Sequence, residues 1–222
     1  MNKKKNSIKE YFALALKNHQ SKNLIAAENQ YKKILEINPE HFESVFYLGA
    51  LSGQLKKFDF AKNLLEKAIQ MRPDYINAYS NLGIVLKELG DFPKAVNCFE
   101  KVIEIQPKHI IAHNILGSIF TELGKYKEAF IHYKKAILIN PNSTLAINNL
   151  SILLREINLN DITRIKKTSI RELLLFLFKR KDVDHNDLCS KAILLFRDKY
   201  YNSNKINFII NSNTSLLKKK II

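Results

Sequence analysis

Four side chains near the C-terminal end of the chain are of the types that bind metal ions. They are Asp182, Asp184, His185 and Asp187, and they form the one cluster in the sequence that combines acidic residues with histidine. Hard cations need several oxygen ligands that converge, whereas carboxylates at the beginning of a helix stabilise that helix. We expect a solvated turn between two helices here, and therefore predict no metal site.

Other residue types that enzymes use also lack a recognisable arrangement. Cys98 and Cys189 stand far apart, without the spacing of a metal or redox pair, and we expect Cys98 to be a small buried apolar residue. The six glycines do not form a phosphate-binding loop, and no Ser/His/Asp or Cys/His pattern has its usual local context. We predict that the chain is not an enzyme, binds no cofactor and takes no small-molecule substrate.

A set of asparagines suggests binding instead. The asparagine amide carries two donors and one acceptor, so it can hold the backbone of an extended peptide by hydrogen bonds. Lys87 and Arg155 lie in the same segments of the chain as these asparagines, and their positive charges could face an acidic ligand. The alternative is that these asparagines reflect a general abundance of Asn, Lys and Ile in the chain. The asparagines of the set are Asn77, Asn81, Asn114, Asn148 and Asn149.

The segments that hold these residues repeat every 34 residues, which is the mark of a repeat architecture. Four copies follow one another without insertion or deletion: copy 1 (8–41), copy 2 (42–75), copy 3 (76–109) and copy 4 (110–143). Residues 144–155 repeat the first half of the unit once more. We expect them to form a helix that closes the array.

Each copy has the pattern of two helices joined by a turn. Its first half holds leucine followed by a small residue, which lets a second helix approach closely. Its second half holds apolar residues at i, i+4 and i+7, which lie on one face of a helix, and a proline ends the copy. In copy 3 these residues are Leu82, Gly83, Ala95, Phe99, Val102 and Pro107.

The turn between the two helices differs among the copies. Copies 3 and 4 have Gly90 and Gly124 there, and glycine accepts the left-handed conformation that often ends a helix. Copies 1 and 2 have Lys22 and Lys56 instead. We expect the turns of copies 1 and 2 to be looser.

The repeated pattern resembles the tetratricopeptide repeat (TPR) family over roughly residues 8–155. The resemblance implies an all-α fold, a right-handed helical solenoid whose first helices line a concave groove. In arrays of the protein O-glycosyltransferase type, an asparagine at the sixth position of the repeat holds the substrate backbone. Asn81 and Asn149 match that position, whereas Tyr47 and Ile115 interrupt the row.

The resemblance favours a non-catalytic scaffold that binds a peptide segment of a protein partner in its groove. TPR arrays also precede catalytic domains in bacterial glycosyltransferases, sulfotransferases and methyltransferases. The alternative function is therefore the substrate-recognition part of a shortened transferase of that kind. The 67 residues after residue 155 are too few for such a catalytic domain.

We divide the chain into a TPR array (1–155) and a basic helical extension (156–222). The formal net charge is +15, and the extension is about twice as basic per residue as the array. Contact of the extension with nucleic acid or a membrane is a weaker alternative. Its apolar run from Leu173 to Phe178 predicts a buried helix packed on the array. The sequence lacks the uninterrupted apolar core of a signal peptide, so we expect a cytoplasmic protein with a frayed start at 1–6.

Overall fold

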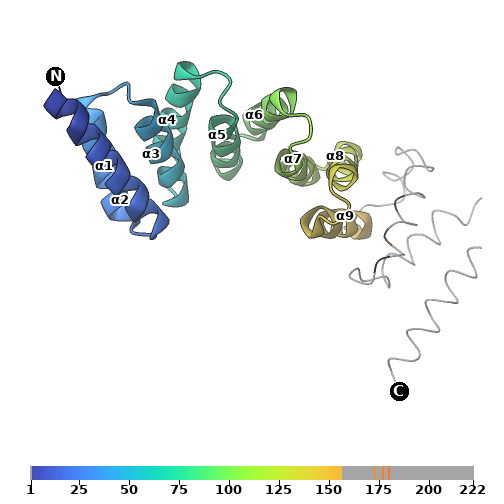
Figure 1. The fold of residues 1–222 in the computed structure, drawn as a ribbon. Helices are drawn as coiled ribbons and strands as arrows, with labels where there is room; N and C mark the ends of the chain where they lie inside the picture. The colour runs from blue at the N-terminus through green and yellow to red at the C-terminus, as the bar shows by residue number, and fades with distance from the viewer. Residues whose placement is uncertain (1, 157–172, 174–176, 178–179, 181–222) are drawn as a thin grey trace, which may run out of the picture. The chain divides into compact units, whose positions relative to one another are not determined.

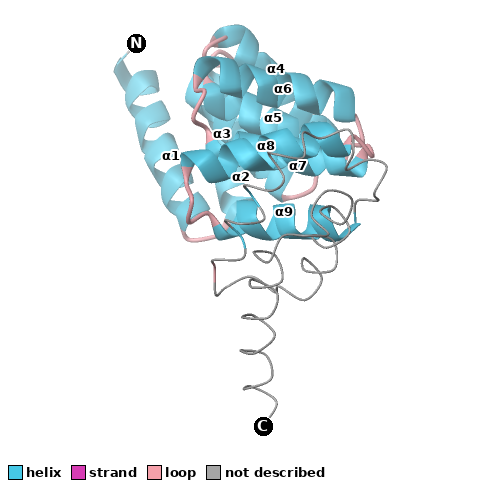
Figure 2. Cartoon of the chain, turned by 90° about the vertical axis from the view of Figure 1, so that its right-hand side faces the viewer, coloured by secondary structure: helices cyan, strands magenta, loops and turns pink. Residues whose placement is uncertain are grey.

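The computed structural model describes residues 2–156 together with Leu173, Leu177 and Arg180 (Figure 1). These residues form α-helices joined by short turns, and no strand occurs among them (Figure 2). The chain divides into two compact units, residues 1–119 and residues 120–222, and we describe each by itself. The predicted all-α fold is confirmed for the described part of the chain.

The helices follow the 34-residue period of the sequence. From α3 on, each odd-numbered helix begins at the first residue of its repeat. A short turn separates the two helices of each repeat. The first unit contains α1 (Asn2–Gln20), α2 (Leu24–Ile37), α3 (Phe42–Gln54), α4 (Phe58–Met71), α5 (Ile76–Glu88), α6 (Phe92–Ile105) and most of α7 (Ile110–Glu122). The second unit contains α8 (Tyr126–Ile139) and α9 (Thr144–Glu156).

In the first unit, consecutive helices pack as pairs that stack on one another. Helix α1 packs on α2, α3 on α4 and α5 on α6, while α2–α3 and α4–α5 contacts join the pairs. Helices α3 and α5 also touch directly, which brings the first helices of copies 2 and 3 side by side (Figure 1).

The core of each pair is the apolar stripe that the spacing predicts. All twelve stripe residues are almost fully buried. Burial of this apolar surface stabilises the fold by roughly 25 cal/mol per Å². They are Ala27, Tyr31, Ile34, Ala61, Leu65, Ala68, Ala95, Phe99, Val102, Ala129, Tyr133 and Ala136.

The small residue after leucine has the packing role that we predicted. A Cβ atom added at Gly83 would lie 2.6 Å from Cε2 of Phe99, and one added at Gly49 would lie 3.0 Å from Cγ of Leu65. Both distances are shorter than ordinary van der Waals contact. The two helices of copies 2 and 3 therefore touch where the first helix lacks a side chain.

The expectation of looser turns in copies 1 and 2 is wrong. Lys22 and Lys56 have φ angles of 62° and 59°, in the same left-handed region as Gly90 at 77° and Gly124 at 69°. The backbone hydrogen bonds of the turn also recur. The N–H of Lys57 donates to Ser52 O at 2.8 Å, and in copies 3 and 4 the N–H of the residue after the glycine donates to the carbonyl oxygen at the equivalent position. These bonds fix the turn, and lysine adopts the conformation at some cost in energy.

We expected a frayed start at residues 1–6, whereas the described backbone is helical from Asn2 on. His113 is a buried residue of α7. Its side chain is 1% exposed, and its Nε2 lies 3.3 Å from the carbonyl oxygen of Pro107. In copy 3 the hydroxyl of Tyr79 donates to the carbonyl of Pro73 at the same place.

Three residues of the predicted extension are described. Leu173 and Leu177 are both buried, as the prediction of a buried helix requires, and the guanidinium of Arg180 donates to the carbonyl of Pro141 at 2.8 Å. Arg180 therefore contacts the turn between α8 and α9 within the second unit. The rest of the extension, with the acidic cluster at 182–187 and Cys189, lies outside the described residues.

Candidate functional site

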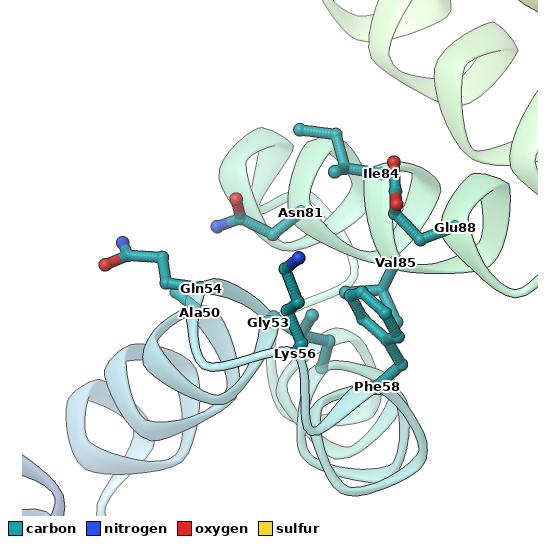
Figure 3. A pocket seen from close by; sticks show the side chains of 10 residues that line it. Ala50, Gly53, Gln54, Lys56, Phe58, Asn81, Ile84, Val85 and Glu88 are labelled. Carbon is teal, nitrogen blue, oxygen red and sulfur yellow. The ribbon is translucent and has the colours of Figure 1, made fainter.

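A pocket of about 320 Å³ opens between α3 and α5 in the first unit (Figure 3). Its walls come from the last turns of α3, the turn into α4, the start and middle of α4, and the middle and end of α5. It is lined by Ala50, Gly53, Gln54, Lys56, Phe58, Leu65, Asn81, Ile84, Val85 and Glu88.

The pocket combines an apolar base with a polar rim. Leu65 and Val85 are almost fully buried, while Ile84 is 43% exposed and offers apolar surface at the opening. The rim holds two amides, one ammonium group and one carboxylate, from Gln54, Asn81, Lys56 and Glu88 (Figure 3). Apolar pockets with a few polar groups at the edge are the usual form of binding sites.

Asn81 is the member of the predicted asparagine set that lies at this pocket. It is half-buried, and its amide has no hydrogen-bond partner among the described residues, so it can bond to a ligand. Asn77 lies one turn earlier on α5 and is exposed. Residues four apart share a face of a helix, so both amides lie on the same face of α5.

Lys87, which we expected to face an acidic ligand, is half-buried and already engaged in an interaction within the protein. The cation at the pocket is Lys56, for which the sequence predicted only a place in a turn. Lys56 is exposed and forms no ion pair with a described residue. Its place at the turn, directly beyond the last residues of α3, was the signal that could have identified it.

The neighbouring lysine has a different role. Lys57 Nζ donates to both carboxylate oxygens of Glu28, at 2.8 Å each, and Lys32 Nζ lies 2.8 Å from the same carboxylate. Hydrogen bonds from Lys32 and Lys57 hold the pKa of the Glu28 carboxyl below its ordinary value. Lys57 therefore joins copies 1 and 2, whereas Lys56 is the lysine that lines the pocket.

Asn114 does not lie on an open surface. It is 3% exposed, and its Oδ1 has no hydrogen-bond partner in the described part of the chain. It occupies the fifth position of its repeat, where copies 1 and 2 have Phe12 and Phe46. Those phenylalanines were the available signal that this position faces the interior.

The remaining members of the predicted set lie in the second unit. Asn148 is exposed and Asn149 is half-buried, both on α9. The backbone of Arg155 is helical, and its side chain lies outside the described part. The structure brings Asn77 and Asn81 together on one helix, whereas a row of asparagines running from Asn81 to Asn149 stays a prediction.

Within the described residues, no group of three or more His, Cys, Asp or Glu side chains is placed to hold a metal ion. Cys98 is buried, and this burial raises the pKa of its thiol to about 11, so the nucleophilic thiolate is scarce near neutral pH. The described helices include none that is long and apolar enough to span a membrane.

Comparison with known proteins agrees with this fold. The tetratricopeptide repeat model matches residues 42–108 and 74–142. A MamA crystal structure is similar at a TM-score of 0.65 and 18% identity, covering 89% of this chain and 97% of that one. A tetratricopeptide repeat protein from Parabacteroides merdae has a TM-score of 0.64 at 18% identity, covering 93% and 98%. No curated protein sequence matches the chain.

A solved transferase shares the repeat fold as well. The O-GlcNAc transferase of Thermobaculum terrenum is similar at a TM-score of 0.54 and 23% identity, over 61% of this chain and 26% of the transferase. The 34-residue period, the helix pairs and the family match lead to the same conclusion: residues 42–142 of the chain are tetratricopeptide repeats.

Proposed function

We propose that the chain is a non-catalytic binding protein that holds an extended peptide segment of a protein partner on the face where α3 and α5 meet. The observation that carries this proposal is the unpaired amide of Asn81 beside an apolar pocket. An amide that donates and accepts can bond to the N–H and C=O groups of a peptide backbone whatever its sequence. Asn77, exposed on the same face, extends this row by one turn of the helix.

The second unit supplies the further asparagines of the proposal. Asn148 and Asn149 would contact another part of the same segment, with Arg155 favouring acidic residues in it. The alternative, recognition of the substrate of a linked transferase, would use the same amides. The likeness to an O-GlcNAc transferase supports the shared fold, and nothing further in the structure favours this alternative.

The proposal is tested by the affinity of a partner captured with the whole chain. One Asn–peptide hydrogen bond contributes about 0.5–1.5 kcal/mol, so Asn81→Ala should weaken binding roughly 2- to 12-fold. The double change with Asn149→Ala should weaken it roughly 5- to 100-fold. Asn97→Ala is the matched control, because Asn97 is an exposed asparagine on α6, and this variant should bind like the intact chain.

A different binding mode would give a different result. If the basic extension bound the partner by charge, affinity would fall steeply with added salt, and the asparagine variants would behave like Asn97→Ala. Equal affinity of the double variant and the intact chain, together with a steep salt dependence, would show that the proposal is wrong.

A further inference from the structure

At the junction between copies 1 and 2, aromatic side chains fill the space between the two first helices. The twelfth position of copy 1 is His19, and the sixth position of copy 2 is Tyr47. Their rings meet edge to face, with centroids 6.4 Å apart. Tyr47 also stacks on Tyr31, with centroids 6.0 Å apart and planes 9° apart. Aromatic side chains therefore occupy the space at this junction.

The equivalent positions at the junction between copies 2 and 3 are Gly53 and Asn81, and the pocket lies there. Gly53 has no side chain, and a Cβ atom added to it would lie 3.2 Å from Cγ2 of Val85. A larger residue at position 53 would enter the pocket or displace its wall. The pocket therefore exists because the twelfth position of copy 2 is glycine.

Lys56 is a second departure from the repeat pattern at the same place. Its φ of 59° is a conformation that favours glycine, and copies 3 and 4 do have glycine there. In copy 2 the turn instead carries an ammonium group at the rim of the pocket (Figure 3). Lys22 has the same conformation in copy 1 but lines no part of this pocket.

We infer that this pocket reads the sequence of the bound peptide: it accepts one aliphatic side chain of the segment, with an acidic residue beside it facing Lys56. The inference rests on the proposed function and deepens it. A volume of about 320 Å³ lies at the low end of the roughly 300–1,000 Å³ typical of ligand pockets, which suits one side chain and the backbone next to it.

The charges on the rim determine on which side of the pocket the acidic residue of the peptide should lie. The ammonium group of Lys56 attracts a carboxylate, whereas the carboxylate of Glu88 repels one. In Figure 3 the carboxylate of Glu88 lies beside Ile84, on the other side of the view from Gln54 and Asn81. An acidic residue should therefore lie on the side of the pocket where Asn81 holds the backbone. The amides supply affinity for any extended peptide, and the pocket supplies selectivity.

The test uses the whole chain and a phage-displayed library of random linear peptides. We expect selection to enrich peptides in which leucine, isoleucine, valine or methionine stands next to aspartate or glutamate. A synthetic copy of the best peptide then measures affinity for each variant. Gly53→Leu should fill the pocket and weaken binding roughly 10- to 100-fold, the equivalent of expelling one buried aliphatic side chain.

Lys56→Gly provides a second test that does not depend on packing. This change removes the ammonium group and also relieves the left-handed backbone, so the melting temperature should rise while the affinity falls about two- to fivefold. Lys22→Gly is the matched control, because it relieves the same conformation away from the pocket. It should raise the melting temperature similarly and leave the affinity unchanged.

The possible results separate this inference from the proposed function. If Asn81→Ala weakens binding while Gly53→Leu and Lys56→Gly do not, the groove binds peptides but the pocket does not select them. If no peptide is enriched, or if none of the three changes affects binding, both are wrong. Enrichment of the same aliphatic–acidic pair by folded Gly53→Leu protein would also overturn the pocket assignment.

Discussion

The junction between copies 1 and 2 and the junction between copies 2 and 3 share one backbone design and differ in their contents. Both have a left-handed lysine or glycine at the turn, and both bury the same apolar stripe. The first is filled by aromatic rings and closed by the Glu28–Lys57 ion pair. The second keeps a pocket with unpaired amides at its rim.

The difference shows that the repeat pattern and the pocket use separate positions of the repeat. The stripe and the small residue after leucine hold the helices together in both junctions. The sixth and twelfth positions, which the stripe does not need, decide whether the surface between the first helices is filled or open. One array can therefore combine a filled junction with an open one.

The largest effect that we expect comes from the aromatic junction. Tyr31 is fully buried and contacts the rings of Phe12, His19 and Tyr47. Tyr31→Ala should lower the free energy of unfolding by about 3–5 kcal/mol, because it leaves a cavity among these rings. The matched change Leu65→Ala, at the same repeat position beside the pocket, should cost about 2–4 kcal/mol. Denaturant melts that rank the two changes in the opposite order would contradict this role of the aromatic rings in holding copies 1 and 2 together.

A smaller loss is expected where helices touch at glycine. Gly83→Leu should lower the free energy of unfolding by roughly 1–3 kcal/mol or more, since its Cβ would already overlap the ring of Phe99. Gly117→Leu, at the same place in copy 4, should behave similarly. Gly90→Ala is an informative comparison, because nothing lies within 4 Å of its added Cβ and only its φ of 77° opposes the change. Unchanged thermal midpoints for both leucine variants would contradict the packing role.

The ion pair of the first junction should give the smallest effect, and one that depends on pH. Glu28→Gln should lower the free energy of unfolding by about 1–2 kcal/mol at neutral pH, since a buried carboxylate loses its bonds to Lys32 and Lys57. Because the folded-state pKa of Glu28 is lowered, its contribution is fully present above its ordinary pKa. The contribution is lost as the pH falls through the folded pKa.

The measurement is a series of melts of the two proteins from neutral pH into acid. The stability difference should stay constant down to about pH 4.5 and then shrink as the pH falls further. Asp59→Asn, an exposed carboxylate at the start of α4, is the control for the general effect of acid. A difference that grows in acid would contradict the assigned ion pair.

The sequence alone determined the fold of the described part. The period set where the helices begin, the i, i+4, i+7 spacing set the buried stripe, and glycine after leucine set the close contacts. These properties are local, because helix periodicity and repeat length are written along the chain. The same reasoning placed Asn81 on the face where the pocket opens, since that face follows from the helical period.

Only the tertiary structure decided which of the predicted residues lie at the pocket. It buried Asn114, engaged Lys87 within the protein and left Lys56 available, because the contacts of a side chain depend on neighbours from other helices. The pocket depends on Gly53 facing Val85 across 32 residues of sequence, and no local pattern encodes that distance. Lys22 and Lys56 show the same principle in the backbone, since the hydrogen bonds of the turn impose on lysine a conformation that its own preference opposes.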